Sequence, residues 1–290
     1  MRKHICIFPI LAVTFLILAF SFSIPSRADA ASYQQLVFYN DDETVSCIQV
    51  GNYYFKQSSS AYATLRVSTK KTSGYKNTGI RASLYEWTNG KYIYYISSNT
   101  LYRYKLATGK TVKIKSLSSI ICSYKYESPS FYISLIYGNY IYITRGCFDE
   151  WKYTTYCYNV KTGKLKKTMN NCDIVLSSGK YCIGANEYKT EASPRKITLY
   201  KISSSGQLKK IKVLGKATCG QWLVNGKFYY TVYSNSNSMG TASLYCCNRN
   251  GKGCKKLVTL NSTSNYIFIY KMTANYFMYY DGGTQKTYSF

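Results

Sequence analysis

Histidine and acidic residues are scarce in this 290-residue chain, and both shortages limit its chemistry. The only histidine is His4, and 12 Asp and Glu residues stand against 38 Lys and Arg, which gives a net charge of +26. Charged residues of both signs make up only 17% of the chain, whereas 46% of it is apolar and 17% aromatic. Intrinsic disorder requires low hydrophobicity, so this composition excludes it and indicates a folded chain with a sizeable core.

The first thirty residues have the features of an export signal. Arg2 and Lys3 precede an almost uninterrupted apolar run over residues 5–24, and Ala28-Asp29-Ala30 supplies the small residues that signal peptidase needs. We therefore predict a signal peptide over residues 1–30, cleaved after Ala30, and a secreted or cell-surface protein without a membrane span in its mature chain. Twenty apolar residues can also just span a bilayer, so an N-terminal membrane anchor is the alternative.

Cleavage after Ala30 would remove the only histidine, and this narrows the possible activities. A mature chain without histidine cannot use a Ser-His-Asp or Cys-His nucleophile, nor build a histidine-containing zinc or iron site. The loss of three basic residues and one acidic residue lowers the net charge from +26 to +24. Phosphate-binding loops and dinucleotide fingerprints are also absent from the sequence. We therefore predict neither a cofactor nor a bound metal.

The mature sequence repeats a β-rich unit. Clear copies begin with GKYIYYIS at residue 90, GNYIYIT at 138, GKYCIGA at 179 and GKFYYTVY at 226, and weaker copies begin at 51 and 274. Gly, Asn and Ser separate four short runs in each unit, and Asn-Gly pairs suit two-residue hairpin turns. Helical periodicity is absent, and the spacing of 39 to 48 residues lies near that of propeller blades.

We therefore predict an all-β single domain over residues 31–290, a six-bladed β-propeller of four-stranded antiparallel blades. Its repeats start near residues 44, 81, 131, 172, 218 and 265. The last unit ends after three strands, and residues 34–39 (QQLVFY) offer a spare strand at the N-terminus. We expect this N-terminal strand to complete the last blade and close the ring, which would protect edges that invite aggregation.

The segment KYIYYISSNTLYRYKLATGK, residues 91–110, resembles the repeat of YWTD propellers from LDL-receptor-like proteins and of TolB-like six-bladed propellers. The chain looks most similar to exported bacterial LDL-receptor-related-like propeller domains of unknown function. This resemblance implies the fold over most of the mature chain. The Tyr-Trp-Thr-Asp signature is kept only loosely, because Tyr94-Tyr95-Ile96-Ser97 lacks the acid and Tyr279-Tyr280-Asp281 retains it. Propellers host binding and enzymatic functions alike, so the resemblance does not name an activity.

Basic residues gather around the last predicted strand of the repeats. Ten of them are candidate binding residues: Lys113, Lys115, Lys164, Lys166, Lys167, Lys209, Lys210, Lys212, Lys255 and Lys256. The last strand of a blade is its outermost one, so these side chains should form a basic rim. Lysine on an edge strand prevents edge-to-edge pairing, and this protection is the simpler interpretation. The size of the net charge also suits attachment to an anionic envelope polymer.

One loop combines carboxylates with other functional side chains. Arg145, Asp149, Glu150 and Trp151 lie in the predicted long loop of the third repeat. A glycosidase needs only two carboxylates at a suitable separation, although a solvated pair of loop acids is the simpler interpretation. Tyrosines recur at fixed positions in the repeats, which indicates packing before ligand binding.

Ten cysteines remain after the predicted cleavage, and an even number in an exported protein permits disulfides. If Asn250-Gly251 is a hairpin turn, Cys247 and Cys254 lie opposite each other across it. Cys147 and Cys157 bracket the predicted long loop of the third repeat and could also pair.

These patterns favour an exported, monomeric, non-catalytic binding or scaffold module at the cell surface, with a protein or an anionic glycopolymer as ligand. The alternative is a carbohydrate-active enzyme that uses loop carboxylates. Nucleic-acid binding would suit the charge but conflicts with export, so no nucleic acid is expected as a partner.

Overall fold

The chain is all-β in the part that the computed structural model describes. The described residues are 33–38, 47–58, 63–82, 85–121, 130–147, 152–186, 195–218, 220–235, 238–262 and 266–290. Apart from one 3₁₀ turn at Ser118–Ile120, every element in these ranges is a strand. Within them, no helix is long and apolar enough to cross a membrane. The described residues fall into two compact units, 33–173 and 174–290.

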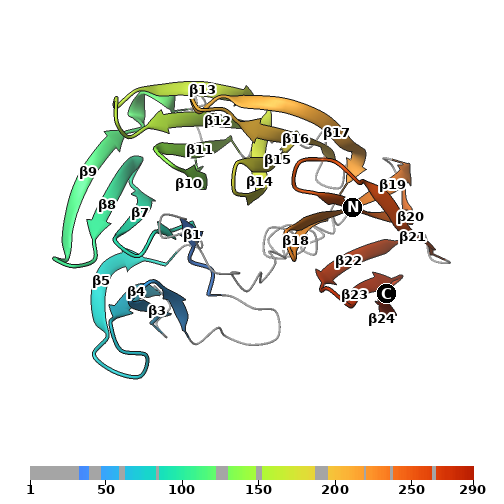
Figure 1. Ribbon diagram of the computed structural model, residues 1–290, viewed down its shortest axis with the longest axis horizontal. Coiled ribbons are helices and arrows are strands. Elements are labelled where there is room, and N and C mark those ends of the chain that lie inside the picture. Colours follow the sequence, from blue (N-terminus) through green and yellow to red (C-terminus); the bar gives the residue numbers. More distant parts are fainter. Residues whose placement is uncertain are drawn as a thin grey trace, which may run out of the picture. The chain divides into compact units, whose positions relative to one another are not determined.

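The first unit contains three groups of strands that pair in chain order (Figure 1). One group is β2 (Ile48–Val50), β3 (Tyr53–Gln57), β4 (Thr64–Ser68) and β5 (Lys76–Arg81). The next is β6 (Trp87–Thr88), β7 (Tyr92–Ser97), β8 (Thr100–Lys105) and β9 (Lys110–Ser116). The third is β10 (Ser130–Tyr137), β11 (Tyr140–Cys147), β12 (Lys152–Asn159) and β13 (Leu165–Asn170). Each group is a four-stranded antiparallel meander.

The second unit repeats this arrangement. It begins within β14 (Cys172–Ser178), which is followed by β15 (Tyr181–Asn186), β16 (Arg195–Ile202) and β17 (Leu208–Thr218). The next sheet is β18 (Gln221–Val224), β19 (Lys227–Asn235), β20 (Ser238–Asn248) and β21 (Lys255–Asn261). In the described residues the last sheet has three strands, β22 (Ile267–Met272), β23 (Tyr276–Asp281) and β24 (Thr284–Ser289).

The N-terminal strand does not pair with the last sheet as predicted. Instead β1 (Gln34–Gln35) runs antiparallel to β6, with Gln34 opposite Thr88. The residues that follow explain this position, because Leu36 and Phe38 are 0% and 3% exposed and belong to the apolar core of the first unit. Burying two large apolar side chains contributes several kcal/mol, on the order of 1.5–3 each, and holds the segment in this unit.

Turn chemistry accounts for several of the hairpins. Asn225 and Gly226 both have positive φ, 48° and 70°, between β18 and β19, so the predicted two-residue Asn-Gly turn is confirmed there. Between β7 and β8 the same turn is formed by Ser98 and Asn99, with φ of 44° and 56°. The second turn contains no glycine, and its sequence therefore gave a weaker signal.

Candidate functional site

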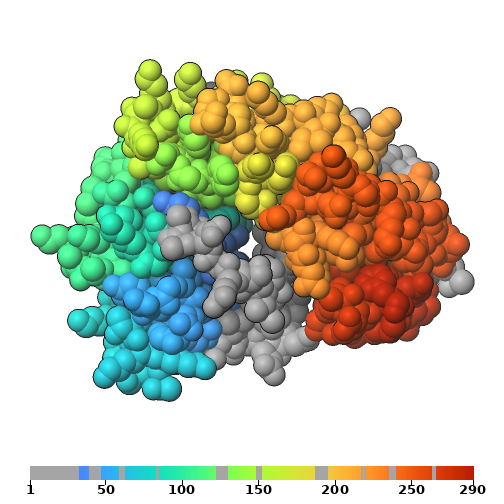
Figure 2. All heavy atoms as spheres, in the orientation of Figure 1, coloured from blue at the N-terminus to red at the C-terminus, as the bar shows by residue number. Residues whose placement is uncertain are grey.

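The candidate lysines lie on the last strand of four meanders or in the turn before it. β9 carries Lys113 and Lys115, β13 carries Lys166 and Lys167 after Lys164 in the preceding turn, β17 carries Lys209, Lys210 and Lys212, and β21 carries Lys255 and Lys256. Eight of these side chains are exposed, and those of Lys115 and Lys212 are half-buried. In the first unit, β9 and β13 lie at the outer surface, where side chains project in the space-filling view (Figure 2).

These four strands share a β-bulge at the same place. In the pairing of β8 with β9, for example, Leu101 stands opposite Lys115, and the next residue, Tyr102, stands opposite Lys113. At this place one residue is therefore extra in each of the four strands, namely Ile114, Thr168, Ile211 and Leu257, and β17 has two further bulges. A bulge increases the local twist and hinders pairing with a second chain, an effect that adds to the one expected from lysine on an edge strand.

A lysine precedes every one of these bulges, and a tyrosine stands opposite it on the neighbouring strand. The four pairs, called the Lys–Tyr pairs below, are Lys113–Tyr102, Lys167–Tyr156, Lys210–Tyr200 and Lys256–Tyr245. Side chains directly opposite each other in an antiparallel pair lie on the same face of the sheet. Each lysine therefore projects from the same face of its sheet as the tyrosine opposite it. The recurrence of both residue types is visible in the sequence, but their pairing depends on the bulge.

The bulge also determines which face the following lysine occupies. Lys210 stands opposite Tyr200, whereas Lys212 stands opposite Leu199. Neighbouring residues on a strand point to opposite faces, so Lys210 and Lys212 point to opposite faces although they are two residues apart. The same reasoning applies to Lys113 and Lys115 on β9.

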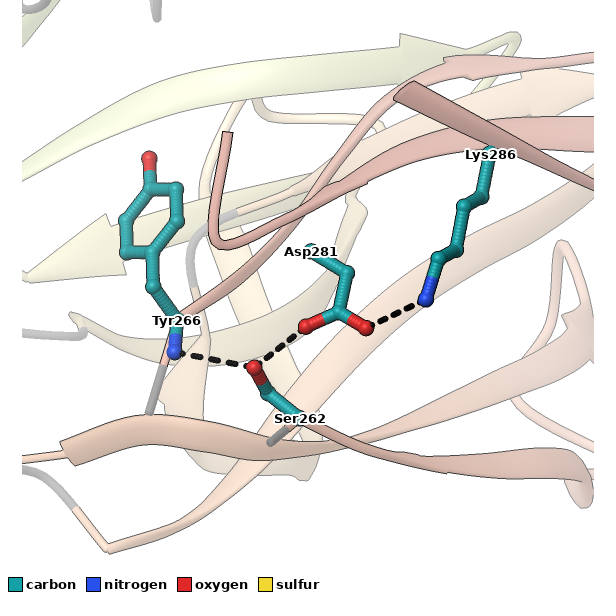
Figure 3. A network of polar contacts seen from close by, with 4 residues as sticks. All are labelled: Ser262, Tyr266, Asp281 and Lys286. Atoms are coloured by element: carbon teal, nitrogen blue, oxygen red, sulfur yellow. Dashed lines mark hydrogen bonds and ion pairs between the residues drawn. The ribbon is translucent and has the colours of Figure 1, made fainter. Parts of the chain in front are cut away.

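The described carboxylates lie away from these lysines. They are Glu86 and Asp173, which are 2% and 8% exposed, and Asp281 in β23. Asp281 accepts a hydrogen bond from the Ser262 hydroxyl and forms an ion pair with Lys286, whose Nζ lies 2.6 Å from Asp281 Oδ2 (Figure 3). Within the described ranges, none of the ten candidate lysines has a carboxylate partner. Their positive charge is therefore not neutralised locally in this part of the chain.

A buried polar cluster surrounds Asp173 in the first unit. The Tyr132 hydroxyl donates a hydrogen bond to Asp173 Oδ2 at 3.0 Å, and the Tyr85 ring lies 4.8 Å from that of Tyr132. Burial raises the pKa of Tyr132 well above its ordinary value, and the charge of Asp173 raises it further. Burial raises the pKa of Tyr85 as well, followed by the charges of Asp173 and Glu86. Both tyrosines therefore remain protonated, and Tyr132 stays a donor to the carboxylate.

The predicted loop site is described only at Arg145, because Asp149, Glu150 and Trp151 lie outside the described residues. Arg145 in β11 donates from Nη1 to the Ile120 carbonyl at 3.0 Å and from Nη2 to Thr154 Oγ1 at 3.3 Å. Its guanidinium also stands 5.9 Å from the centre of the Tyr156 ring. In the described ranges, no group of three or more His, Cys, Asp or Glu residues is placed to hold a metal ion.

The predicted pairing of Cys147 with Cys157 is wrong. Cys147 is in a disulfide, but Cys157 carries a free thiol, and burial raises its pKa to about 11. The connection after β11 is short, so Lys152 stands opposite Cys147 and Cys157 stands opposite Tyr142, five positions further along the ladder. Five residues of strand span about 17 Å, too far for a disulfide. Cys247 and Cys254 are both free thiols in this structure.

No protein-family model matches the sequence, and no curated protein matches it. Among solved structures, the fold is similar to an oligogalacturonate lyase in complex with manganese, at 9% identity and a TM-score of 0.45, over 81% of this chain and 73% of that one. It is similar to an uncharacterized protein of Listeria monocytogenes, at 12% identity and a TM-score of 0.43, over 89% and 82% of the two chains. A third similar structure is dipeptidyl peptidase 4 of Porphyromonas gingivalis, at 10% identity and a TM-score of 0.49, over 82% of this chain and 45% of that one. These similarities concern the fold alone.

Proposed function

We propose that the mature chain is an exported six-bladed β-propeller that binds an anionic glycopolymer of the cell envelope through its lysine-bearing outer strands, without catalysis. Antiparallel meanders that follow one another at a 39-to-48-residue spacing support the propeller. The N-terminal apolar segment and its cleavage motif support export. The net charge, +26 for the whole sequence and +24 after the predicted cleavage, supports an anionic partner.

The Lys–Tyr pairs are the observation that carries the binding role. Edge protection alone accounts for a lysine and a bulge on an outer strand. It does not require a tyrosine opposite each lysine. Tyr102, Tyr200 and Tyr245 are half-buried, whereas Tyr156 is 8% exposed, so the tyrosine is partly accessible in three of the four pairs. An ammonium group on the same face as such a ring offers one contact for a phosphate or carboxylate and another for the face of a sugar.

The direct test compares two variants of the mature chain with the same loss of charge. The first has the four lysines of the Lys–Tyr pairs replaced by glutamine. The matched control has four other exposed lysines replaced by glutamine, namely Lys76, Lys161, Lys196 and Lys227, which have no aromatic residue opposite them in the described ladders. Binding is measured by calorimetry to a soluble poly(glycerol phosphate) glycopolymer, with uncharged dextran as the reference ligand.

We expect the first variant to lose about tenfold in affinity, because four exposed charge contacts contribute a few tenths of a kcal/mol each. The control should lose much less, and binding of the unaltered chain should weaken as salt rises, since exposed charges are screened. Equal losses in both variants, or binding that is insensitive to salt, would contradict the proposal. No binding to the polymer would instead favour a protein ligand.

The alternative role as a carbohydrate-active enzyme is tested on the same samples. Release of reducing ends or of phosphate from the polymer is followed over hours. The non-catalytic proposal expects none. Turnover that disappears in the variants Asp149→Asn and Glu150→Gln would favour the enzyme.

A further inference from the structure

Two thiols meet at the hairpin that connects β20 to β21 in the second unit. Cys246 stands opposite Lys255 in the ladder, so the next position along places Cys247 opposite Cys254. Cys247 is fully buried and Cys254 half-buried, and Cys254 lies close enough to Cys247 to raise the pKa of the Cys247 thiol. Residues directly opposite in an antiparallel pair have Cα atoms about 4.5–5.5 Å apart, which lies in the range for a disulfide. Both groups are nevertheless free thiols in this structure.

A lysine from the neighbouring sheet contacts one of these sulfurs. Lys212 on β17 donates from Nζ to Cys254 Sγ at 3.3 Å and to the Gly251 carbonyl at 3.4 Å. Cys254 donates its own thiol proton to the same carbonyl at 3.3 Å. Of the two thiols, Cys254 is therefore the one that accepts a hydrogen bond from the ammonium group of Lys212. A positive charge at this distance stabilises negative charge on the sulfur during nucleophilic attack.

The turn is packed closely enough to maintain this contact. Gly251 has a φ of +80°, and a Cβ at this position would lie 2.8 Å from Leu199 Cδ2 and 3.4 Å from Lys212 Cδ. Glycine is thus required both by the backbone conformation and by the close approach of the turn to β16 and β17. The hairpin rests directly against the strand that carries Lys212.

The position of Cys247 is occupied differently in two other sheets. The equivalent position lies two residues after the tyrosine of each Lys–Tyr pair. It is Tyr104 on β8, Tyr158 on β12 and Cys247 on β20. The Tyr104 hydroxyl lies 3.4 Å and that of Tyr158 4.0 Å from where a Cβ on the turn glycine of its own hairpin would be. The β20 hairpin therefore has a small thiol where those two sheets pack an aromatic side chain over the turn.

We propose that Cys254 is a nucleophile for small-molecule disulfides and that Cys247 resolves the resulting mixed disulfide, so that the pair cycles between dithiol and disulfide. This inference is independent of the proposed binding to an anionic polymer. Its substrate class is a dialkyl disulfide, R–S–S–R, which serves as the oxidant.

The two steps balance as follows. Cys254 Sγ loses its proton and attacks one sulfur of R–S–S–R; a Cys254–S–S–R bond forms and one thiolate leaves, which takes up a proton as R–SH. Cys247 then loses its proton, and its sulfur attacks Cys254 Sγ. The Cys247–Cys254 bond forms and the second R–SH is released. The protein is oxidised by two electrons, and one external disulfide is reduced to two thiols.

The burial of the two cysteines determines which of them reacts first. Burial, followed by the neighbouring Cys254, raises the pKa of Cys247 to about 12, so Cys247 is a protonated thiol before the reaction. Cys247 is also 0% exposed and cannot meet an external disulfide first, whereas Cys254 is accessible. Once Cys254 is in a mixed disulfide it carries no negative charge, which removes one cause that disfavours the Cys247 thiolate.

The test uses the reduced mature chain and oxidised glutathione, followed by acid quench and peptide mapping by mass spectrometry. The unaltered chain should form a Cys247–Cys254 cross-link with the loss of two hydrogen masses. The Cys247→Ser variant should accumulate one glutathione on Cys254, and the Cys254→Ser variant should leave Cys247 unmodified. Half-buried Cys157, with its pKa of about 11, is the internal comparison and should react much more slowly than Cys254.

A second pair of variants separates the role of the lysine from that of general charge. Lys212→Met should slow glutathione addition to Cys254 by about three- to tenfold, because thiolate is the nucleophile and its stabilising charge is lost. Lys216→Met removes an exposed charge elsewhere on the same strand and should leave the rate unchanged. The proposal is overturned if Cys157 or Cys247 reacts before Cys254, if no cross-link forms, or if both lysine variants react at the same rate. Iodoacetamide labelling of the unaltered native chain gives the same order of reactivity without any variant that could misfold.

Discussion

Replacing Tyr132 with phenylalanine tests whether the buried polar cluster stabilises the first unit. The hydroxyl of Tyr132 donates to Asp173 Oδ2 at 3.0 Å, and Asp173 is only 8% exposed. Phenylalanine keeps the ring and its packing against Tyr85 and removes only the hydroxyl. The carboxylate then loses one donor in a place where water replaces it poorly.

The size of the effect depends on pH in a defined direction. At pH 8 a hydrogen bond to a charged group contributes about 1.5–3 kcal/mol, so we expect a loss of about 2 kcal/mol. The pKa of Tyr132 is raised above its ordinary value of 10.0, chiefly by burial. The contribution of the Tyr132 hydroxyl to stability is complete below pH 10. It is lost as pH rises, because Tyr132 ionises in the unfolded chain before it ionises in the folded one. At pH 11 the unfolded state gains about 1.4 kcal/mol from this one residue.

The assay is urea denaturation followed by far-UV circular dichroism, at pH 8 and at pH 11. The free energy of unfolding of the unaltered chain should exceed that of Tyr132→Phe by about 2 kcal/mol at pH 8 and by only about 0.6 kcal/mol at pH 11. Comparing the two proteins cancels the titration of the lysines. Tyr137→Phe, which alters an exposed ring, should change stability at pH 8 by less than about 0.5 kcal/mol. A difference between Tyr132→Phe and the unaltered chain that stays constant between the two pH values would refute the reasoning.

Two further substitutions have defined outcomes. Trp87→Phe removes the buried hydrogen bond from Nε1 to the Ile133 carbonyl at 2.9 Å and should cost about 1–3 kcal/mol in urea denaturation; an unchanged midpoint would contradict this. Asp281→Asn removes the ion pair with Lys286, whose pKa is raised first by the hydrogen bond to Asp281. The pair stabilises the fold below pH 10.5 and this effect is lost as pH rises through the raised pKa, so the gap in melting temperature between the two proteins should close at high pH. High salt should narrow the same gap, and a gap that is independent of salt would argue against the ion pair.

The positions of the strands could be read from the sequence because their signals are local. The copy beginning at Gly90 predicts a strand that the structure places at Tyr92–Ser97, and Asn225-Gly226 predicts a turn that is confirmed. Alternation and turn residues act over a few positions, so one chain is enough to reveal them. The pairing partner of the N-terminal strand, in contrast, depends on residues that are distant in the sequence. Its alternation shows that one face is buried, but the packing of Leu36 and Phe38 in the first unit decides which sheet receives it.

Only part of the candidate site could be predicted from local sequence patterns. Lysines on the last strands were predicted, whereas the tyrosine opposite each one depends on a one-residue bulge such as that at Ile114. A bulge leaves no distinct residue pattern, so register could not be derived from spacing. The Cys147–Cys157 prediction failed for a related reason. It assumed a long loop, but β12 begins at Lys152 and carries Cys157 to the far end of the pairing.

Because the Lys–Tyr pair recurs in four sheets of the described chain, the proposed binding would be multivalent. A single phosphate or sugar acid would occupy one pair and gain one weak contact. A polymer that repeats its own charge, once held at one pair, presents its next units to any further pair within its reach at a high effective concentration. The strength of binding would then grow with the length of the ligand and would fall stepwise as pairs are removed one by one. Polymer length, more than the chemistry of one unit, would decide which molecules remain attached.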